Sequence, residues 1–210
     1  MVTNISETFD FLAKGGIIMV PIIFCSFLSL AVFIERLSSL KKQRVIPKKL
    51  FRAVEELIRE GRIEDAIKLC DRDGSSLSRI IKVGIRNHGK TREAVKEAIE
   101  EVGSREVARL DKYTGIMGTI ASITPLLGLL GTVSGMIKVF AVISTEGVGN
   151  PGVLAGGISE ALITTASGLS VAIPTFVAYK YILSKADSLV IEMEEHSTHV
   201  VELLKAESDD

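Results

Sequence analysis

Three long stretches without charged side chains constrain the fold of this chain more than any other feature. Residues 15–34 and 113–137 hold no charged residue, and residues 147–179 hold one, Glu160. A helix needs about 20 residues to cross the roughly 30 Å hydrocarbon core of a bilayer. The sequence therefore predicts an all-α integral membrane protein with three transmembrane helices, at 15–35, 113–140 and 157–181.

The composition agrees with this segregation of charge. Charged residues make up 24% of the 210 residues, yet the mean hydropathy is +0.34. Charged and apolar residues must therefore occupy different stretches, which excludes a soluble enzyme and a disordered chain. Cys25 and Cys70 lie in different environments, so a disulfide scaffold is excluded as well. Glu7 and Asp10 make the leading segment acidic and no small-residue cleavage site follows, so we expect the first span to be retained.

The distribution of basic residues predicts the orientation of the spans. Residues 36–112 contain 20 Lys and Arg, whereas only Lys14 precedes the first span and residues 139–159 contain none. Basic segments stay on the cytoplasmic side of a membrane. We therefore expect an outer N-terminal segment at 1–14, a cytoplasmic region at 36–112, an outer loop at 141–156 and a cytoplasmic C-terminal helix and tail at 182–210.

The hydrophilic segments show helical spacing of apolar residues. Ile5, Phe9 and Leu12 predict a short amphipathic helix on the outer membrane surface, and a frayed terminus is an equally open interpretation. Four helices are predicted within 36–112, with Thr91 as the N-cap of the last one. Their apolar faces are Leu50, Val54, Leu57 and Ile58; Ile63, Ala66, Ile67 and Cys70; Leu77, Ile80, Ile81 and Gly84; and Ala94, Val95, Ala98 and Val102.

Two of the spans are expected to continue into the cytoplasm. No helix breaker stronger than Gly103 stands between Thr91 and the second span, so a continuous helix to Phe140 would be about 75 Å long. The segment after the third span also carries an apolar stripe. We therefore predict that transmembrane helices 2 and 3 extend into a cytoplasmic helical bundle, completed by other copies of the chain.

Signatures of enzymes and cofactor sites are absent from the sequence. It contains no zinc-binding His-Glu-x-x-His, no Gly-x-Ser-x-Gly elbow and no phosphate-binding loop. His196 and His199 could share a metal, but an exposed polar helix face is the favoured interpretation. The 13 acidic residues within 36–112 disfavour nucleic-acid binding. We expect no enzyme activity, no cofactor and no metal site.

The second span carries small residues at helical spacing. Gly131 and Gly135 form a small-xxx-small pair, and Pro125, Gly128, Thr132 and Gly135 are expected to share a face. Small residues let another helix approach closely, so we interpret the glycines as a packing seam. Thr132 either adds a hydroxyl to a functional path or bonds back to a carbonyl of its own helix.

The third span contains the one carboxylate inside the apolar stretches. An ionisable residue within a span is costly and points to function. Glu160, Thr164 and Ser167 line one helical face, Thr165 and Gly168 line a neighbouring one, and Pro174 is expected to kink the helix. The alternative is that Glu160 is hydrated near the outer surface or paired with Lys138.

Depth along the helices suggests a polar path. If the spans end at Phe140 and begin at 157, Thr132 and Thr165 each lie about 12 Å below the outer boundary, at the same level. Lys138 and Glu160 then lie about three residues deep. Threonine hydroxyls do not titrate in this pH range, so they could only support a water chain or orient a proton acceptor. A mid-depth carboxylate would have to come from a partner.

At these residues the chain resembles the MotA/TolQ/ExbB proton channel family, specifically its three-span ExbB/TolQ branch. The resemblance lies in TPLLGLLGTVSGMIKVF at 124–140 and GISEALITTASGLSVAIPTFVAY at 157–179, with further likeness at 61–70 and 100–112. The paired motifs at this spacing are specific, whereas a lone Gly-Leu-Leu-Gly-Thr would not be. A short leader leaves the ExbB and TolQ roles both open.

The resemblance implies a homopentamer in the bacterial cell inner membrane, with a periplasmic N-terminus and a cytoplasmic C-terminus. It further implies an ExbD- or TolR-like single-span partner that supplies a transmembrane aspartate, and a TonB- or TolA-like protein energised by the proton motive force. Thr132, Thr165 and Glu160 would belong to the proton pathway. A structural scaffold without conduction and a sodium-driven motor subunit remain as alternatives, although sodium would require more hard oxygen ligands than this chain offers.

Overall fold

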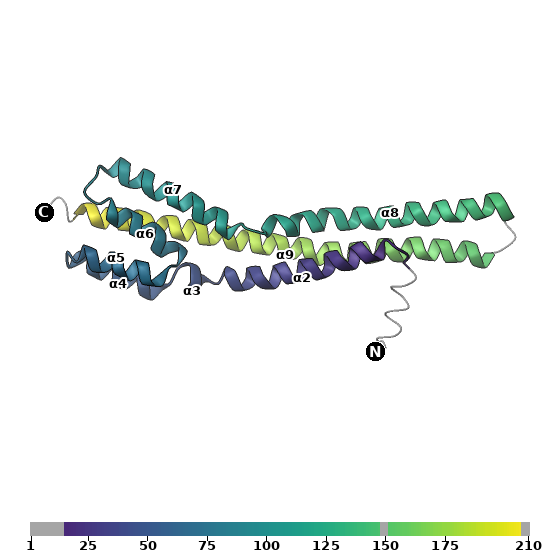
Figure 1. The fold of residues 1–210 in the computed structure, drawn as a ribbon, viewed down its shortest axis with the longest axis horizontal. Helices are drawn as coiled ribbons and strands as arrows, with labels where there is room; N and C mark the ends of the chain where they lie inside the picture. The colour runs from purple at the N-terminus through teal and green to yellow at the C-terminus, as the bar shows by residue number, and fades with distance from the viewer. Residues whose placement is uncertain (1–14, 148–150, 207–210) are drawn as a thin grey trace. The chain divides into compact units, whose positions relative to one another are not determined.

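The computed structural model describes residues 15–147 and 151–206, and these divide into two compact units. Of the described residues, 15–34, 113–147 and 151–181 form the membrane unit, and 35–112 and 182–206 form the hydrophilic unit. Every regular element in the described part of the chain is an α-helix, which confirms the all-helical fold (Figure 1). The amphipathic helix predicted at 1–14 falls outside the described residues.

Three helices are long and apolar enough to cross a membrane, as the sequence predicts. They are α2 (Met19–Ser39), α8 (Thr114–Glu146) and α9 (Pro151–Ala206). Residues 15–18 form a turn ahead of α2 and not the first turn of the helix. In the membrane unit, α8 and α9 run antiparallel and side by side, and α2 also packs against α9 (Figure 1).

The expected outer loop at 141–156 is shorter in the structure. The helix α8 continues through Glu146, and α9 already begins at Pro151. Residues 141–146 and 151–156 are therefore helical. The sequence offers no stop signal at Phe140, since its next glycine is Gly147, where the backbone takes a φ of 72° and α8 ends.

The expectation that the second span continues directly into the preceding helix is wrong. Three residues separate the end of α7 (Arg92–Leu110) from the start of α8. Tyr113 takes a left-handed φ of 68°, a conformation that costs a side-chain-bearing residue about 1–2 kcal/mol. The buried Arg36 donates from Nη1 to the Leu110 carbonyl at 3.2 Å and so satisfies one of the free carbonyls at the end of α7. Neither glycine nor proline marks this break, which is why the sequence did not predict it.

Within residues 35–112, the hydrophilic unit contains the short helix α3 (Lys42–Val45) and four longer ones. These are α4 (Lys48–Arg59), α5 (Ile63–Asp73), α6 (Ser76–Arg86) and α7. Gly74 ends α5 in the left-handed conformation, and the Ser75 and Thr91 hydroxyls accept backbone N–H bonds at the starts of α6 and α7. The helix α5 packs against α4 and α6, and α6 packs against α7.

The buried face of α7 differs from the predicted one. The structure buries Val95, Ile99, Glu106 and Leu110, so only Val95 of the four expected residues lies in the core. The reason is the contact with α6, where a Cβ at Gly84 would lie 2.9 Å from Ile99 Cδ1. The missing side chain at Gly84 admits Ile99 into the core, whereas Ala94, Ala98 and Val102 are half-buried.

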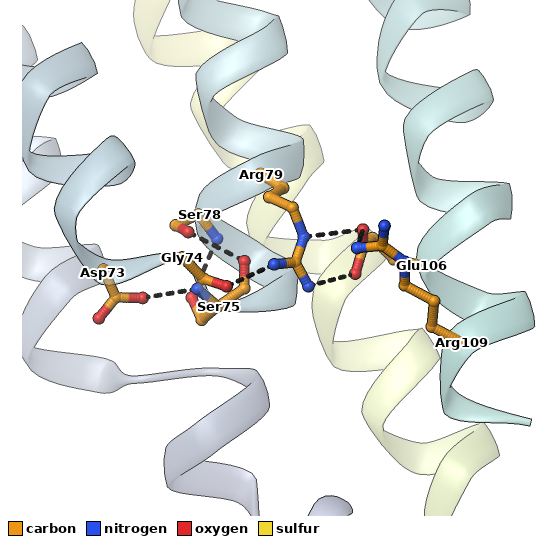
Figure 2. A network of polar contacts seen from close by, with 7 residues as sticks. All are labelled: Asp73, Gly74, Ser75, Ser78, Arg79, Glu106 and Arg109. Carbon is orange, nitrogen blue, oxygen red and sulfur yellow. Dashed lines mark hydrogen bonds and ion pairs between the residues drawn. The ribbon is translucent and has the colours of Figure 1, made fainter. Parts of the chain in front are cut away.

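A buried ion pair connects α6 and α7. Glu106, whose side chain is 3% exposed, accepts from Arg79 Nε at 2.8 Å and from Arg79 Nη2 at 2.7 Å, and from Arg109 at 2.9 Å. Arg79 also donates to the Gly74 carbonyl, so the network reaches the turn between α5 and α6 (Figure 2). Burial opposes ionisation of Glu106, but hydrogen bonds from Arg79 and Ser76 and the charges of both arginines outweigh it and lower the pKa of this carboxyl.

Replacing Arg79 by leucine is expected to destabilise the α6–α7 pair by about 1–3 kcal/mol, because it leaves the buried Glu106 carboxylate with Arg109 as its remaining arginine partner. Hydrogen exchange of α6 and α7 amides in the detergent-solubilised protein measures the effect. Arg105→Leu is the matched control, since Arg105 pairs with Glu101 on the exposed side of α7 and such pairs contribute little. Equal protection in both variants would contradict a stabilising role for the buried pair.

The contacts of Glu106 with Arg79 and Arg109 also predict that α6 and α7 lose stability as the pH falls. A carboxyl whose folded pKa is lowered adds stability above its unfolded pKa, about 4.3 for glutamate, and loses this contribution as the pH falls through the folded value. Exchange protection of α6 and α7 should therefore decrease below about pH 4 in the unmodified protein. In Glu106→Gln this part of the pH dependence should be missing.

Candidate functional site

Glycines on α8 and α9 form the seam between these helices. A Cβ at Gly168 would lie 2.8 Å from the Thr124 carbonyl oxygen, and one at Gly128 would lie 3.1 Å from Thr165 Cα. Added side chains at Gly131 and Gly135 would overlap Thr164 and Ala161 in the same way. The backbones approach this closely because no side chain separates them.

This seam lies on a slightly different face of α8 from the one the sequence predicts. Thr124, Gly128, Gly131 and Gly135 are buried against α9, whereas Pro125 and Thr132 are only half-buried at its edge. Pro174 is exposed in the single chain, and α9 continues through it as a helix. The small-xxx-small pair therefore packs within one chain, and the edge position leaves Thr132 partly accessible.

The two threonines expected at one level are about one helical turn apart. The Thr165 hydroxyl donates to the Gly128 carbonyl at 2.8 Å, so Thr165 lies beside Gly128 and not beside Thr132. The Thr132 hydroxyl instead donates to the Leu129 carbonyl of its own helix at 2.7 Å. Counting residues from the ends of the spans gives the wrong register, because the glycine contacts set how α8 and α9 are aligned.

The acidic residue in the third span is paired with a lysine of the second. Lys138 Nζ donates to Glu160 Oε1 at 2.6 Å, and their side chains are 57% and 26% exposed. Residues 15–34, 113–145 and 151–179 contain no other carboxylate. An acidic and a basic side chain thus lie together at one end of the α8–α9 seam.

Thr164 lies one turn from Glu160 and is fully buried. Its hydroxyl has two acceptors within reach, the Glu160 carbonyl at 2.8 Å and the Gly15 carbonyl at 2.7 Å. Ser167, on the same side of α9, is half-buried. The predicted face of Glu160, Thr164 and Ser167 therefore packs in part against the turn that precedes α2.

Two polar contacts of the membrane unit were not predicted from the sequence. Ser29 of α2 and Thr175 of α9 share a hydrogen bond of 2.8 Å, and both are buried. The contact of Gly15 and Gly16 with α9 was missed as well. Single hydroxyl residues in the apolar stretches were the only signal for the first contact, and a doubled glycine at the start of a span was the only signal for the second.

The remaining candidates lie in the hydrophilic unit. His196 stacks on Phe51 with ring centroids 4.2 Å apart, and His199 Nε2 lies 3.4 Å from Glu55 Oε1. No group of three or more His, Cys, Asp or Glu side chains able to hold a metal occurs in the described parts of the chain. Burial, with smaller contributions from neighbouring aspartates, raises the pKa of the Cys70 thiol to about 12, so this cysteine stays protonated in the core.

The arrangement in the membrane unit can support proton movement but does not complete a path. The Thr165 hydroxyl donates to a carbonyl and keeps its lone pairs available as acceptors. Glu160 is the one carboxyl group in residues 15–34, 113–145 and 151–179. No described side chain of this chain supplies a carboxylate beside Thr165.

Comparison with known proteins places these features in a family. The model of the MotA/TolQ/ExbB proton channel family matches residues 73–195. An ExbB-like protein of Synechocystis sp. is 30% identical over 190 residues, which cover 87% of this chain and 73% of that protein. The biopolymer transport protein ExbB of Pseudomonas putida is 25% identical, over 92% of this chain and 60% of the relative. The Tol-Pal system protein TolQ of Haemophilus influenzae is 29% identical, over 82% and 81%.

The match covers more than half of the chain, including the second span, the third span and the segment between them. This chain therefore belongs to the MotA/TolQ/ExbB proton channel family. It is an all-helical, multi-pass membrane protein with three helices able to span a bilayer.

Proposed function

We propose that this protein is the proton-conducting stator subunit of an inner-membrane motor. With an ExbD- or TolR-like single-span partner, it would use the proton motive force to energise a TonB- or TolA-like protein that acts on the outer membrane. The observation that carries this proposal is Glu160, the one carboxylate in the apolar stretches, placed beside Lys138 at one end of a polar seam. Intramembrane carboxylates characteristically mark ion pathways.

The proposed partner would supply the carboxylate that the polar path of this chain lacks. A proton that passes Glu160 meets the Thr164 and Thr165 hydroxyls, which hold no exchangeable charge at neutral pH. A transmembrane aspartate of a single-span helix beside Thr165 would complete the relay. The match to ExbB and TolQ proteins, which are named for biopolymer transport and for the Tol-Pal system, supports this type of partner.

Orientation and assembly are part of the same proposal. The 20 basic residues within 36–112 favour a cytoplasmic hydrophilic unit, a periplasmic N-terminus and a cytoplasmic C-terminus. Within that unit, a groove of about 900 Å³ opens between α7 and the last part of α9. Its lining includes the half-buried Val107, Val190 and Val201, which supports a bundle completed by neighbouring copies in a homo-oligomer, a pentamer by family resemblance.

Proton flux into liposomes tests the proposed function directly. The protein is reconstituted with its single-span partner, a pH gradient and a potassium-diffusion potential are imposed, and an internal pH dye reports the flux. We expect flux that needs both proteins and that is lost in Glu160→Ala. Flux that follows an imposed sodium gradient instead would assign the sodium-driven alternative, and absence of any flux would refute conduction.

A structural scaffold is the second candidate, and the Lys138–Glu160 pair is the observation that favours it. If the pair only joins α8 to α9, the unmodified protein with its partner should conduct no ions, and Glu160→Ala should lower only the thermal stability of the detergent-extracted oligomer. The two candidates thus predict different results for the unmodified protein and for this variant.

Reversing both charges of the Lys138–Glu160 pair should partly restore what either single reversal loses. Glu160→Lys places two cations side by side, whereas the double variant restores opposite charges, so we expect a coupling of about 0.5–1 kcal/mol in thermal stability. Reversal of the exposed Glu101–Arg105 pair is the control and should show almost no coupling. Fully additive effects at 138 and 160 would show that the two side chains act independently.

A further inference from the structure

The turn that precedes α2 lies directly against the acidic site of α9. The Gly15 carbonyl accepts the Thr164 hydroxyl proton at 2.7 Å, with Thr164 fully buried. Gly16 follows with a φ of +70°, a conformation that favours glycine. The start of the first span is therefore attached to α9 one turn from Glu160.

Gly16 also lies so close to Glu160 that a side chain at position 16 would displace the carboxylate. A Cβ at this residue would overlap Glu160 Oε1 and come within 3.0 Å of its Cδ. This oxygen is the same one that accepts the Lys138 ammonium at 2.6 Å. The backbone of the turn before α2 on one side and the lysine on the other thus hold a single carboxylate oxygen in place.

We propose that the Gly15–Gly16 turn is the positioning element of Glu160. The bare backbone at Gly16 fits against the carboxylate, the Thr164–Gly15 hydrogen bond holds the turn there, and together they keep Glu160 directed at Lys138 and covered on the α2 side. The effect on proton flux rests on the proposed function, whereas the effect on the accessibility of Glu160 does not.

Gly147 provides a matched control for backbone strain. It has a φ of +72°, nearly that of Gly16, but a Cβ there would meet nothing within 4 Å. Alanine at either position forces a side-chain-bearing residue to a positive φ, which L side chains rarely adopt. Only alanine at position 16 also displaces the Glu160 carboxylate.

Carbodiimide modification of Glu160 in membranes that contain the full-length protein tests the positioning role. Mass spectrometry measures the rate at Glu160 relative to the exposed Glu194 of the same chain. We expect Gly16→Ala to raise this ratio several-fold and Gly147→Ala to leave it unchanged. Equal ratios in the two alanine variants would overturn the proposal.

Thr164→Val covers the case in which Gly16→Ala is not recovered from the membrane. Valine nearly keeps the shape of the side chain and replaces the hydroxyl that donates to the Gly15 carbonyl with a methyl group, which cannot bond to it. The turn is then no longer held against α9, so the modification ratio should again rise. An unchanged ratio in Thr164→Val would overturn the tethering of the turn.

A shorter acid at position 160 should reduce the effect of Gly16→Ala, which gives a further test. Aspartate lacks one methylene and withdraws the carboxylate from the space that an added methyl group at position 16 needs. The Gly16→Ala substitution should therefore change the modification ratio much less in a Glu160→Asp background than in the unmodified chain. Equal changes in both backgrounds would show that residue 16 does not act on the carboxylate.

Proton flux in liposomes distinguishes a failure of the proposed function from a failure of the positioning role of the turn. If conduction is correct, Gly16→Ala should lower the flux several-fold while Gly147→Ala does not. If no variant conducts, including the unmodified protein with its partner, the proposed function fails, and the modification ratios still decide whether the turn positions Glu160.

Discussion

Thr165→Val is expected to lower proton flux at least about tenfold, which corresponds to about 1.4 kcal/mol in the barrier, while the protein still assembles. Valine keeps the packing of Thr165 against Gly128 and removes the hydroxyl that donates to the Gly128 carbonyl. An interhelical hydrogen bond in a membrane contributes only about 0.6 kcal/mol on average, so the loss of stability should be small. A large loss of flux in a protein that still assembles would then show that the Thr165 hydroxyl belongs to the proton path.

Flux in reconstituted liposomes and oligomer elution in detergent measure the two quantities. Thr119→Val is the control, because Thr119 is exposed on α8 and its hydroxyl donates to the Gly115 carbonyl of its own helix. We expect Thr132→Ala to behave like Thr165→Val in flux and to cost even less stability, since the Thr132 hydroxyl also bonds within its own helix. Normal flux in both Thr132→Ala and Thr165→Val would refute the polar path.

Gly168→Ala is expected to destabilise the membrane unit by about 1–3 kcal/mol, the usual cost of overpacking. The added Cβ would meet the Thr124 carbonyl oxygen at 2.8 Å and Gly128 Cα at 3.1 Å. Both are backbone atoms of α8, so the clash can be relieved only by separating the two helices. The thermal midpoint of the detergent-solubilised protein should fall.

Gly156→Ala is the matched control on the same helix. Gly156 is exposed, and a Cβ there would meet nothing within 4 Å. Alanine is better than glycine inside a helix by about 1 kcal/mol, so this variant should be neutral or more stable. A Gly168→Ala protein as stable as Gly156→Ala would show that α8 and α9 do not pack through this glycine.

Local sequence signals were sufficient to predict the helices and several of the residues at which they end. Uncharged stretches of 20 and 25 residues predicted spans, because bilayer thickness translates directly into helix length. Gly74 and Thr91 marked helix ends correctly, since capping depends on residues within one turn. The break before Tyr113 escaped prediction because no nearby residue causes it, whereas a distant one, Arg36, stabilises the end of α7.

In the candidate site, too, the sequence identified the residues but not the contacts between residues of different helices. Glu160 and the threonines were identified from the sequence because polar residues are conspicuous in an apolar stretch. Their alignment was not, because Thr165 lies beside Gly128 only as a consequence of how the glycines of two helices interlock. The role of Ile99 in the core of the hydrophilic unit likewise depends on the space that Gly84 leaves on another helix.

The sequence by itself determined that this protein is helical and membrane-spanning, which residues carry its intramembrane charge, and which family it resembles. Only the tertiary structure decided that Thr132 and Thr165 lie a turn apart, that Lys138 and Glu160 form a pair, and that a glycine turn before the first span lies against Thr164 and Glu160. The physical reason is that helix formation and membrane insertion depend on neighbours along the chain. Register and contact depend instead on how closely two backbones can approach, and that is known only when both are in place.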